Sequence, residues 1–462
     1  MCVRPAIWRL AIVSALLSPA CGSPGAPDDD APLALSIPAQ SSFAEAVASV
    51  ETVASAQPTA PAPCPVEVLR KAQRRLFDSS VKDDFFPRAD PRDAGLDGAA
   101  LDALVDGAER AGSDSLLLIK DGKIVIEREV MPQAGPIELR SITKGIAALA
   151  VLALIADGAI ASLDEPLSTY FSEFAVGDKS RITLRHVMSH TSGLRHAKTN
   201  ADALNAQPDR TAYARGLSVV DPPGSVFSYS NEATQLLSGV IAQAAHESPD
   251  SYVKRRIFDA LAIADFSWKR DRAGNVQTYY GLSLRARDLA KIGLLLLGDG
   301  GYQGVRVLPQ KLVRELFEPG ARYGGYGLCF WLDPKVTQDV DRLAAIQLSE
   351  VEKNALSPLT GKPFESSEAY FIEAKKVLGA APYGRVRTLH RERKGPLETL
   401  PGRASALIAL GGLGQRLEVH PDFGLIAVRL HRRRPGDDSR ESLVTFRAMQ
   451  ELVFRISRPC SR

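Results

Sequence analysis

Three positions in this chain of 462 residues place a serine three residues before a lysine: Ser79/Lys82, Ser141/Lys144 and Ser251/Lys254. On a helix, such residues are neighbours with about 5–6 Å between their Cβ atoms. A neutral lysine there can take the proton of the serine hydroxyl and so activate it as a nucleophile. This chemistry requires the lysine pKa to fall by about three units from its usual value of ~10.4, and burial lowers it.

Only Ser141 and Lys144 begin a segment that can bury the lysine. Residues 141–156 are apolar and alanine-rich, with no glycine or proline after Gly145, which predicts a buried helix. A serine at a helix start also lies at the positive end of the helix dipole, which favours a developing alkoxide. The other two pairs lie among charged and polar residues. On this pattern alone, Ser141 fits an ordinary helix N-cap equally well.

A second candidate group is Tyr229-Ser-Asn231. A phenol can relay a proton between a nucleophile and a leaving group, and an amide two residues further along an extended turn can face the same cleft. The alternative is a buried tyrosine beside a turn asparagine, which the preceding Asp-Pro-Pro-Gly favours.

With these motifs, the chain resembles the serine β-lactamase-like hydrolases, which include class C β-lactamases, DD-peptidases, certain carboxylesterases and 6-aminohexanoate-oligomer hydrolases. The resemblance runs from about residue 95 to 456 in family order, through segments 139–144, 163–166, 182–194, 223–231, 281–293 and 326–331. It implies an α+β, β-lactamase/transpeptidase-like fold, in which helices flank an antiparallel sheet and a mostly helical domain is inserted. It is closest to the esterase and amide-oligomer hydrolase branch.

The resemblance also implies roles for individual residues. Ser141 would be the nucleophile, Lys144 and Tyr229 would pass protons, and Asn231 would orient groups in the cleft. The backbone N–H groups of Ser141 and Gly412 would form an oxyanion hole. The residues expected to contact the substrate are Tyr280, Trp331, Ala409 and Gly411.

One departure from the family concerns the substrate. Ala409-Leu410-Gly411 stands where β-lactamases and DD-peptidases carry Lys-Thr-Gly, whose lysine helps to hold the substrate carboxylate. This change favours small-molecule esters and unstrained amides, unless another cation such as Arg287 or Arg403 substitutes. The alternatives are a β-lactamase or DD-peptidase acting on cell-wall peptides, and a non-catalytic envelope ligand-binding protein of the same fold.

A second departure is an insertion at about residues 334–403, where relatives use a far shorter connection. Helices are expected over 336–355 and 365–378, followed by a basic stretch over 385–393. The insertion is interpreted either as a surface addition or as a lid that selects the acyl or leaving group.

The remaining segments define the expected organisation. We expect a signal peptide over 1–20, a flexible tether over 21–85, an α/β domain over 86–150 and 271–462, and a helical domain over 151–270. Further expected elements are helices at 97–111, 233–245, 285–297, 312–317 and 438–456, a hairpin at 115–120 and 124–130, and strands at 404–410, 415–419 and 425–430.

The N-terminus predicts export from the cytoplasm of a bacterium. Arg4 and Arg9 precede a short apolar stretch, and Cys21 follows small residues. Cys21 is therefore either lipidated, which would attach a periplasmic or outer-membrane lipoprotein to the membrane, or lost by simple cleavage. An oxidising compartment makes Cys64 and Cys460 a disulfide candidate.

Composition excludes several other function classes. A net charge of +3 gives no electrostatic basis for nucleic-acid binding. No Cys/His spacing indicates a metal site, and no cofactor is expected. Cys329, within an aromatic stretch, is expected to be a small buried residue, and His190 a structural one.

Overall fold

A seven-stranded sheet lies at the centre of the computed structural model, which describes residues 77–78, 86–91, 93–131, 134–197, 202–434 and 449–456. All of these belong to one compact unit, Ala39–Arg462. The strand order is β1-β3-β2-β15-β14-β13-β9. Every neighbouring pair is antiparallel except β1 with β3. The strands are β1 (Phe77–Asp78), β2 (Ser115–Lys120), β3 (Lys123–Glu129), β9 (Trp331–Asp333), β13 (Ala406–Gly411), β14 (Gln415–His420) and β15 (Leu425–Leu430).

Local sequence signals account for the first elements of this sheet layer. Helix α3 (Gly98–Arg110) begins after Asp97, whose side chain accepts a hydrogen bond from the Ala100 N–H at 2.9 Å. The β2–β3 hairpin turns at Asp121 and Gly122, which have φ angles of 48° and 75°. Glycine and aspartate tolerate such values better than most residues. The predicted helix and hairpin are both confirmed.

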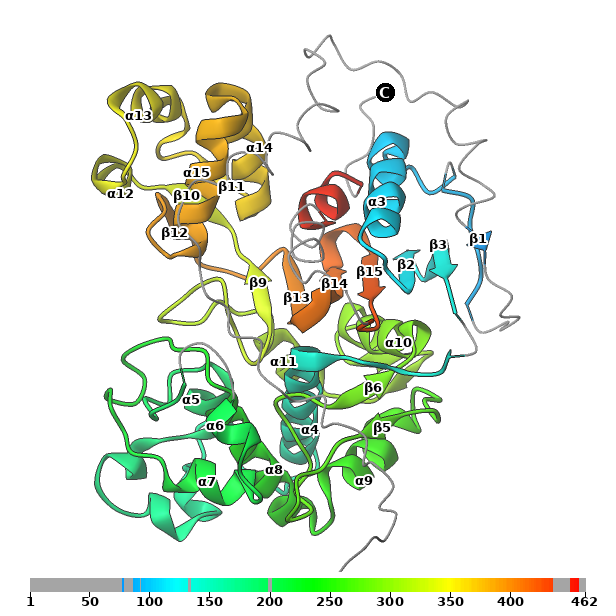
Figure 1. Cartoon of the computed structure of the whole chain (residues 1–462), viewed down its shortest axis with the longest axis vertical. Helices are drawn as coiled ribbons and strands as arrows, with labels where there is room; N and C mark the ends of the chain where they lie inside the picture. Colours follow the sequence, from blue (N-terminus) through cyan, green and yellow to red (C-terminus); the bar gives the residue numbers. More distant parts are fainter. Residues whose placement is uncertain are drawn as a thin grey trace, which may run out of the picture. The chain divides into compact units, whose positions relative to one another are not determined.

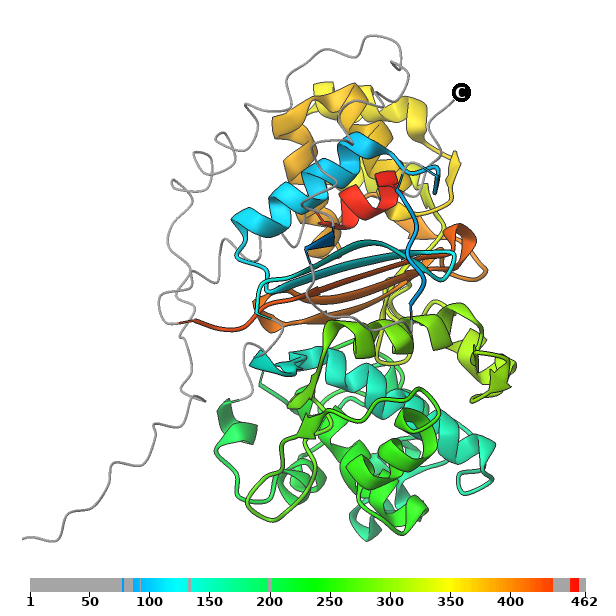
Figure 2. The same cartoon turned by 90° about the vertical axis from the view of Figure 1, so that its right-hand side faces the viewer.

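Helices cover the two faces of the sheet, as Figure 2 shows edge-on. Helix α3 and residues 449–456 pack on one face through Leu101, Leu104 and Val453. Helix α10 (Ala286–Leu297) packs on the other, where a Cβ added to Gly293 would come within 2.8 Å of Ile426. This second face is continuous with the largest apolar core, which also encloses α4 (Thr143–Ala156).

The region between β4 (Ile137–Glu138) and α10 is mainly helical, and Figure 1 shows it beyond the α10 face of the sheet. Helix α8 packs against α4 in the shared core. A small sheet of order β4-β6-β5 lies beside them. The remaining elements up to β9 are α5 (Leu184–Met188), α6 (Asp202–Asn205), α7 (Arg210–Gly216), α8 (Asn231–Ala245), α9 (Pro249–Val253), β5 (Ser267–Trp268), β6 (Leu282–Leu284), β7 (Gly301–Tyr302), β8 (Val305–Arg306) and α11 (Gln310–Glu315).

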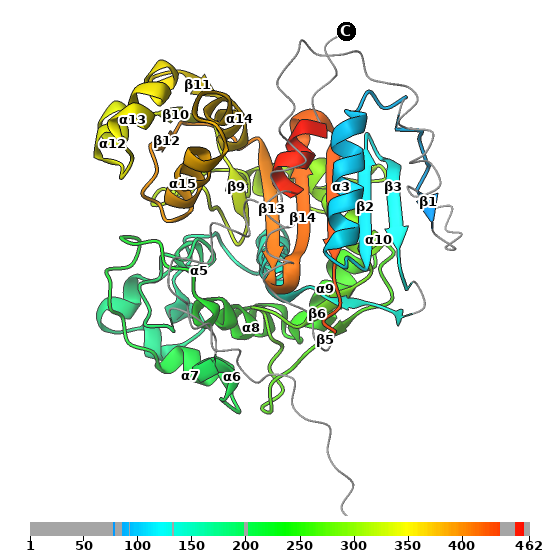
Figure 3. The same ribbon diagram turned by 45° about the horizontal axis from the view of Figure 1, so that its top comes forward.

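Residues 334–403, hereafter the insertion, fold around a core of their own beside the β9 edge of the sheet (Figure 3). The expected helix over 336–355 is wrong at its start, because Val336–Gln338 form strand β10, which pairs with β11 and β12. The helix expected over 365–378 is confirmed as α14. The other elements are α12 (Val340–Ala345), α13 (Glu350–Leu356), β11 (Pro363–Phe364), α14 (Ser367–Leu378), α15 (Ala380–Arg391) and β12 (Leu397–Thr399).

Several predictions fall on residues that the structure does not describe. These include the signal peptide, most of the tether, Cys21, the Cys64–Cys460 disulfide and the start of the terminal helix. Within the expected tether, Phe77–Asp78 form strand β1. Among the helices of the described ranges, none combines the length and apolar composition that a membrane span requires.

Candidate active site

Ser141 lies at the entrance to the buried helix α4. A single 3₁₀ turn, Arg140–Ile142, leads directly into that helix, and Arg140 adopts a left-handed φ of 52°. A non-glycine residue in this region carries backbone strain, and such strain is concentrated at functional sites. Ser141 is half-buried, whereas 12 of the 14 residues of α4 are buried. The predicted buried helix is therefore confirmed, with the serine at its positive end.

The lysine one turn further along contacts this serine. Lys144 Nζ lies 3.1 Å from Ser141 Oγ, and Lys144 is only 1% exposed. Burial lowers the pKa of Lys144 to about 7, although electrostatic interactions with Cys329 and Glu232 act in the opposite direction. Near neutral pH, a large fraction of this amine is therefore uncharged and able to accept a proton.

A backbone carbonyl fixes the amine in place. Lys144 Nζ also donates a hydrogen bond to the carbonyl oxygen of Tyr279 at 2.8 Å. A neutral amine that donates to Tyr279 has a lone pair left to accept a hydrogen bond from the hydroxyl of Ser141. Tyr279 could not be identified from its residue type, because every residue supplies a carbonyl.

Tyr229 completes a cluster of three groups. Its ring centroid lies 4.9 Å from Lys144 Nζ. Burial raises the pKa of Tyr229 above its usual value, and a hydrogen bond with Ser141 acts in the opposite direction. The phenol is thus kept protonated and beside the serine hydroxyl. The predicted association of Ser141, Lys144 and Tyr229 is present in the structure.

The rings of Trp331 and His190 pack against Tyr229. The Trp331 ring stacks on the Tyr229 ring, with 5.9 Å between the centroids and 15° between the planes. His190 lies two residues after the end of α5, and its ring centroid is 4.4 Å from that of Tyr229. His190 Nδ1 accepts a hydrogen bond from the Ser230 N–H at 3.2 Å. Burial, together with the nearby Lys144 and His196, holds the pKa of His190 well below its usual range. His190 is therefore a neutral ring that positions Tyr229.

The stretch from Tyr326 to Trp331 packs directly on α4. A Cβ at Gly145 would lie 2.5 Å from the ring of Phe330, so only glycine fits at this crossing. Cys329 is a buried free thiol, as expected, and burial raises its pKa to about 12. The packing of this stretch on α4 places Trp331 against Tyr229. The raised pKa keeps the Cys329 thiol protonated.

Strand β13 ends against the residues that precede the serine. A Cβ at Gly411 would lie 2.4 Å from the carbonyl oxygen of Leu139, whereas one at Gly412 would meet only Arg140 Cγ at 3.9 Å. Gly411 thus permits a close approach of two backbones, as expected for an oxyanion hole between Ser141 and Gly412. Ala409, 3% exposed, pairs with Leu417 in β14 and lies in the apolar core.

The roles predicted for Asn231 and Tyr280 remain predictions. Asn231 is the first residue of α8 rather than part of an extended turn, because Ser230 caps that helix by accepting from the Ala233 N–H. Within the described ranges, no hydrogen bond joins the Asn231 side chain to Ser141, Lys144 or Tyr229. The Tyr280 hydroxyl accepts a hydrogen bond from Arg210 at 3.3 Å, in a separate apolar cluster.

The two arginines considered as substitutes for the family lysine are paired with carboxylates. Arg287 Nε and Nη2 both bond Glu127, and Arg287 and Glu127 are largely buried. Arg403 lies 3.3 Å from Asp299 and stacks 4.3 Å over the ring of Phe317. Neither one is therefore a free cation near Ala409.

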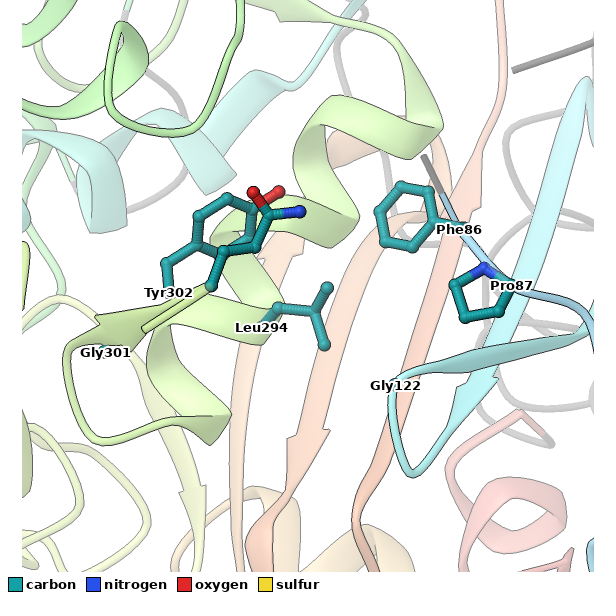
Figure 4. A pocket seen from close by; sticks show the side chains of 7 residues that line it. Phe86, Pro87, Gly122, Leu294, Gly301 and Tyr302 are labelled. Atoms are coloured by element: carbon teal, nitrogen blue, oxygen red, sulfur yellow. The ribbon is translucent and has the colours of Figure 1, made fainter. Parts of the chain in front are cut away.

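Two pockets lie away from Ser141. One, of about 270 Å³, lies between Phe86, Pro87, Leu294 and Tyr302, under the β2–β3 turn (Figure 4). The other, of about 220 Å³, is lined by residues 192–196 together with Val220, Asp221 and Ser228. In the described part of the chain, no group of three or more His, Cys, Asp or Glu side chains has the arrangement of a metal site.

Comparison with known proteins gives the following relatives. Esterase EstB from Burkholderia gladioli is 27% identical over 281 residues, which cover 52% of this chain and 69% of EstB. Beta-lactamase-like protein 2 from Dictyostelium discoideum is 30% identical over 176 residues, or 36% of this chain and 30% of that protein. Protein flp from Staphylococcus aureus is 27% identical over 173 residues, or 34% of each chain. The chain thus aligns with only about a third of the length of the last two relatives.

Solved structures share the fold. A candidate beta-lactamase from Bacteroides dorei superposes with a TM-score of 0.53 at 16% identity, covering 78% of this chain and 99% of that chain. A candidate 6-aminohexanoate-dimer hydrolase from Bacillus anthracis gives a TM-score of 0.51 at 18% identity, with coverage of 75% and 79%. At these identities the likeness concerns the fold alone, and the predicted β-lactamase/transpeptidase-like fold class is confirmed.

The family assignment rests on the length of the sequence match. The model of the Beta-lactamase family matches residues 99–443, which include the entire cluster around Ser141. This match confirms the resemblance seen in the motifs. The chain belongs to the beta-lactamase family of serine hydrolases, which includes esterases, amidases and beta-lactamases.

Proposed function

We propose that the chain hydrolyses esters or unstrained amides through a covalent acyl-enzyme on Ser141. The observation that carries this proposal is the 3.1 Å contact between the buried Lys144 amine and the half-exposed Ser141 hydroxyl. A serine at a helix start next to a neutral amine is an activated nucleophile. The identity shared with Esterase EstB supports the choice of ester substrates.

In the first half of the reaction, Ser141 Oγ attacks the substrate carbonyl while its proton passes to Lys144 Nζ. The backbone N–H groups of Ser141 and Gly412 stabilise the oxyanion, each donor contributing about 3 kcal/mol. The tetrahedral intermediate then collapses, the bond to the leaving group breaks, and the proton reaches that group through the Tyr229 hydroxyl.

In the second half, water attacks the acyl-enzyme. Lys144 and Tyr229 accept the proton from this water and return a proton to Ser141 Oγ as the carboxylic acid leaves. Asn231, the first residue of α8, passes no proton in this scheme and is proposed to orient groups of the substrate in the cleft. No metal or cofactor is required for any of these steps.

The proposed preference for esters and neutral amides over β-lactams follows from the lack of a positive charge at Ala409. Ala409 offers no cation, and Arg287 and Arg403 are paired with Glu127 and Asp299. A β-lactam carboxylate would therefore lack a partner at this position. Esters and neutral amides have no such requirement.

Hydrolysis of a substrate panel tests this proposal. The panel contains p-nitrophenyl esters, a chromogenic cephalosporin and D-Ala-D-Ala peptides. We expect the esters to be hydrolysed far faster than the cephalosporin and the peptides. Fast turnover of the cephalosporin with little esterase activity would overturn the ranking. Hydrolysis of none of the substrates would favour a non-catalytic ligand-binding protein.

A further inference from the structure

One side chain of the insertion lies on the aromatic residues next to the proposed active site. The Arg393 guanidinium donates a hydrogen bond to the carbonyl oxygen of Phe227 at 3.1 Å. Its Cζ atom lies 5.0 Å from the Phe227 ring centroid and 5.6 Å from that of Tyr323. The insertion thus brings a cation to the chain segment that carries Tyr229, two residues beyond Phe227.

Arg393 differs from its neighbours in having no carboxylate partner within the described ranges. In the preceding helix α15, Arg385 pairs with Glu352, and Arg387 pairs with Glu368 at 2.6 Å. Arg393 is exposed, and one hydrogen bond to a carbonyl leaves most of its N–H donors available. Such a group can bind a carboxylate with two parallel hydrogen bonds.

An unbroken row of rings joins Arg393 to the catalytic cluster. The Phe227 ring lies 5.3 Å from that of Tyr326, which lies 6.1 Å from that of Tyr229. Tyr323 and Trp331 flank the row, at 5.1 Å from Phe227 and 5.9 Å from Tyr229. Phe227 and Tyr326 are buried, whereas Tyr229, Tyr323 and Trp331 are partly exposed, so a ligand can contact these three rings.

We propose that Arg393 and the exposed rings of Tyr229, Tyr323 and Trp331 bind the leaving group of the substrate, and that they select an aromatic alcohol or amine that ends in a carboxylate. This inference rests on the proposed function. The row lies on the leaving-group side because Tyr229, which delivers the proton to that group, must lie within hydrogen-bond reach of it. The carboxylate would bind Arg393 while the aromatic body contacts the exposed rings.

Two acetate esters that differ only in the charge of the leaving group test this proposal. They are 4-acetoxyphenylacetate, which is anionic, and its amide 4-acetoxyphenylacetamide, which is neutral. Both form the same acetyl-enzyme, so a difference in kcat/KM reports on the leaving-group site. We expect the native chain to prefer the anion, and R393Q to lower the anion-to-amide ratio of kcat/KM by about tenfold, as the loss of a charge-assisted bond predicts.

Three controls distinguish binding of the leaving group by Arg393 from a structural role, in which Arg393 only holds the insertion against Phe227. K394Q removes the adjacent exposed lysine, whose partner is Glu392, and should leave the ratio unchanged. R393K keeps the charge and should retain part of the preference. Without any substitution, raising the salt concentration should lower the ratio for the native chain, because salt screens an exposed ion pair.

Two results would overturn the proposal. One is a native chain that shows no preference for the anion while a fluorophosphonate still labels Ser141, which would leave the proposed function standing. The other is an R393Q variant in which kcat/KM falls by the same factor for both esters. That result would mean that Arg393 only holds the insertion against Phe227. Failure of the native chain both to cleave the esters and to be labelled would overturn this inference together with the proposed function.

Discussion

The carbonyl oxygen of Tyr279 accepts a hydrogen bond from the Lys144 amine at 2.8 Å, across 135 residues of sequence. This bond holds Nζ between a backbone acceptor and the hydroxyl of Ser141, 3.1 Å away. The amine is thereby directed at the serine before any substrate binds.

The activity should depend on pH through Lys144. Burial lowers the pKa of Lys144 to about 7, and only the neutral amine can accept the proton of Ser141. We therefore expect kcat/KM for a neutral ester to rise with pH through an apparent pKa near 7 and then to level off. A pH–rate profile measures this directly. A profile that is flat between pH 6 and 9 would exclude Lys144 as the base.

The same burial should cost stability. The folded chain holds Lys144 at a pKa of about 7, whereas the unfolded chain holds it near ~10.4. Between these two pKa values the unfolded chain binds more protons than the folded chain, so the free energy of unfolding should rise with pH. The destabilisation by Lys144 should reach its full size below pH 7. Relative to K144M, the native chain should gain on the order of 2 kcal/mol in free energy of unfolding from pH 6 to 9. Urea unfolding of both proteins at each pH measures the difference, and an unchanged difference would contradict a depressed pKa.

Substitution of Tyr229 should affect amides more than activated esters. Y229F keeps the ring that stacks on Trp331 but removes the hydroxyl that donates the proton. A p-nitrophenolate leaves without protonation, whereas an anilide nitrogen must be protonated. We expect kcat/KM to fall by roughly 10²–10⁴-fold for a p-nitroanilide and by clearly less for the p-nitrophenyl ester of the same acid. Equal losses on both substrates would argue that Tyr229 has no role in proton transfer to the leaving group.

Gly411 should be required for the geometry around the nucleophile. In G411A, the new Cβ would lie 2.4 Å from the carbonyl oxygen of Leu139, so the backbone beside Ser141 must shift. We expect kcat to fall by about 10²-fold or more, as expected when an oxyanion donor is misplaced. The control is G216A in α7, where the added Cβ meets no atom within 4 Å. Wild-type kcat in G411A would show that this close approach is not needed for activity.

Local sequence signals accounted for much of the fold. The Asp97 cap, the Asp121-Gly122 turn and the apolar residues of α4 each act within a few residues of the chain, and the elements they predict are present. Strand β10 was missed because it has only three residues, too few to show an alternating pattern. Its partner β12 lies about sixty residues further along the chain.

The side-chain groups of the candidate site were predicted from the sequence, but its backbone acceptor was not. Ser141 and Lys144 come together as their spacing predicted, and Tyr229 joins them as the resemblance to the family implied. The Tyr279 carbonyl could not be found in this way, because a backbone acceptor has no sequence signature. The extended turn expected at Asn231 was wrong, because Ser230 in the same motif caps a helix that begins there. The role of Arg393 depends on how the insertion packs, which no local pattern determines.

Covalent labelling shows whether Ser141 is an activated nucleophile. The folded chain is treated with a fluorophosphonate, digested, and analysed by mass spectrometry, alongside S141A and K144M. We predict one adduct, on the peptide that contains Ser141, with no adduct in S141A and much slower labelling in K144M. An unlabelled folded protein, or an adduct on another serine that persists in S141A, would show that Ser141 is not the activated nucleophile.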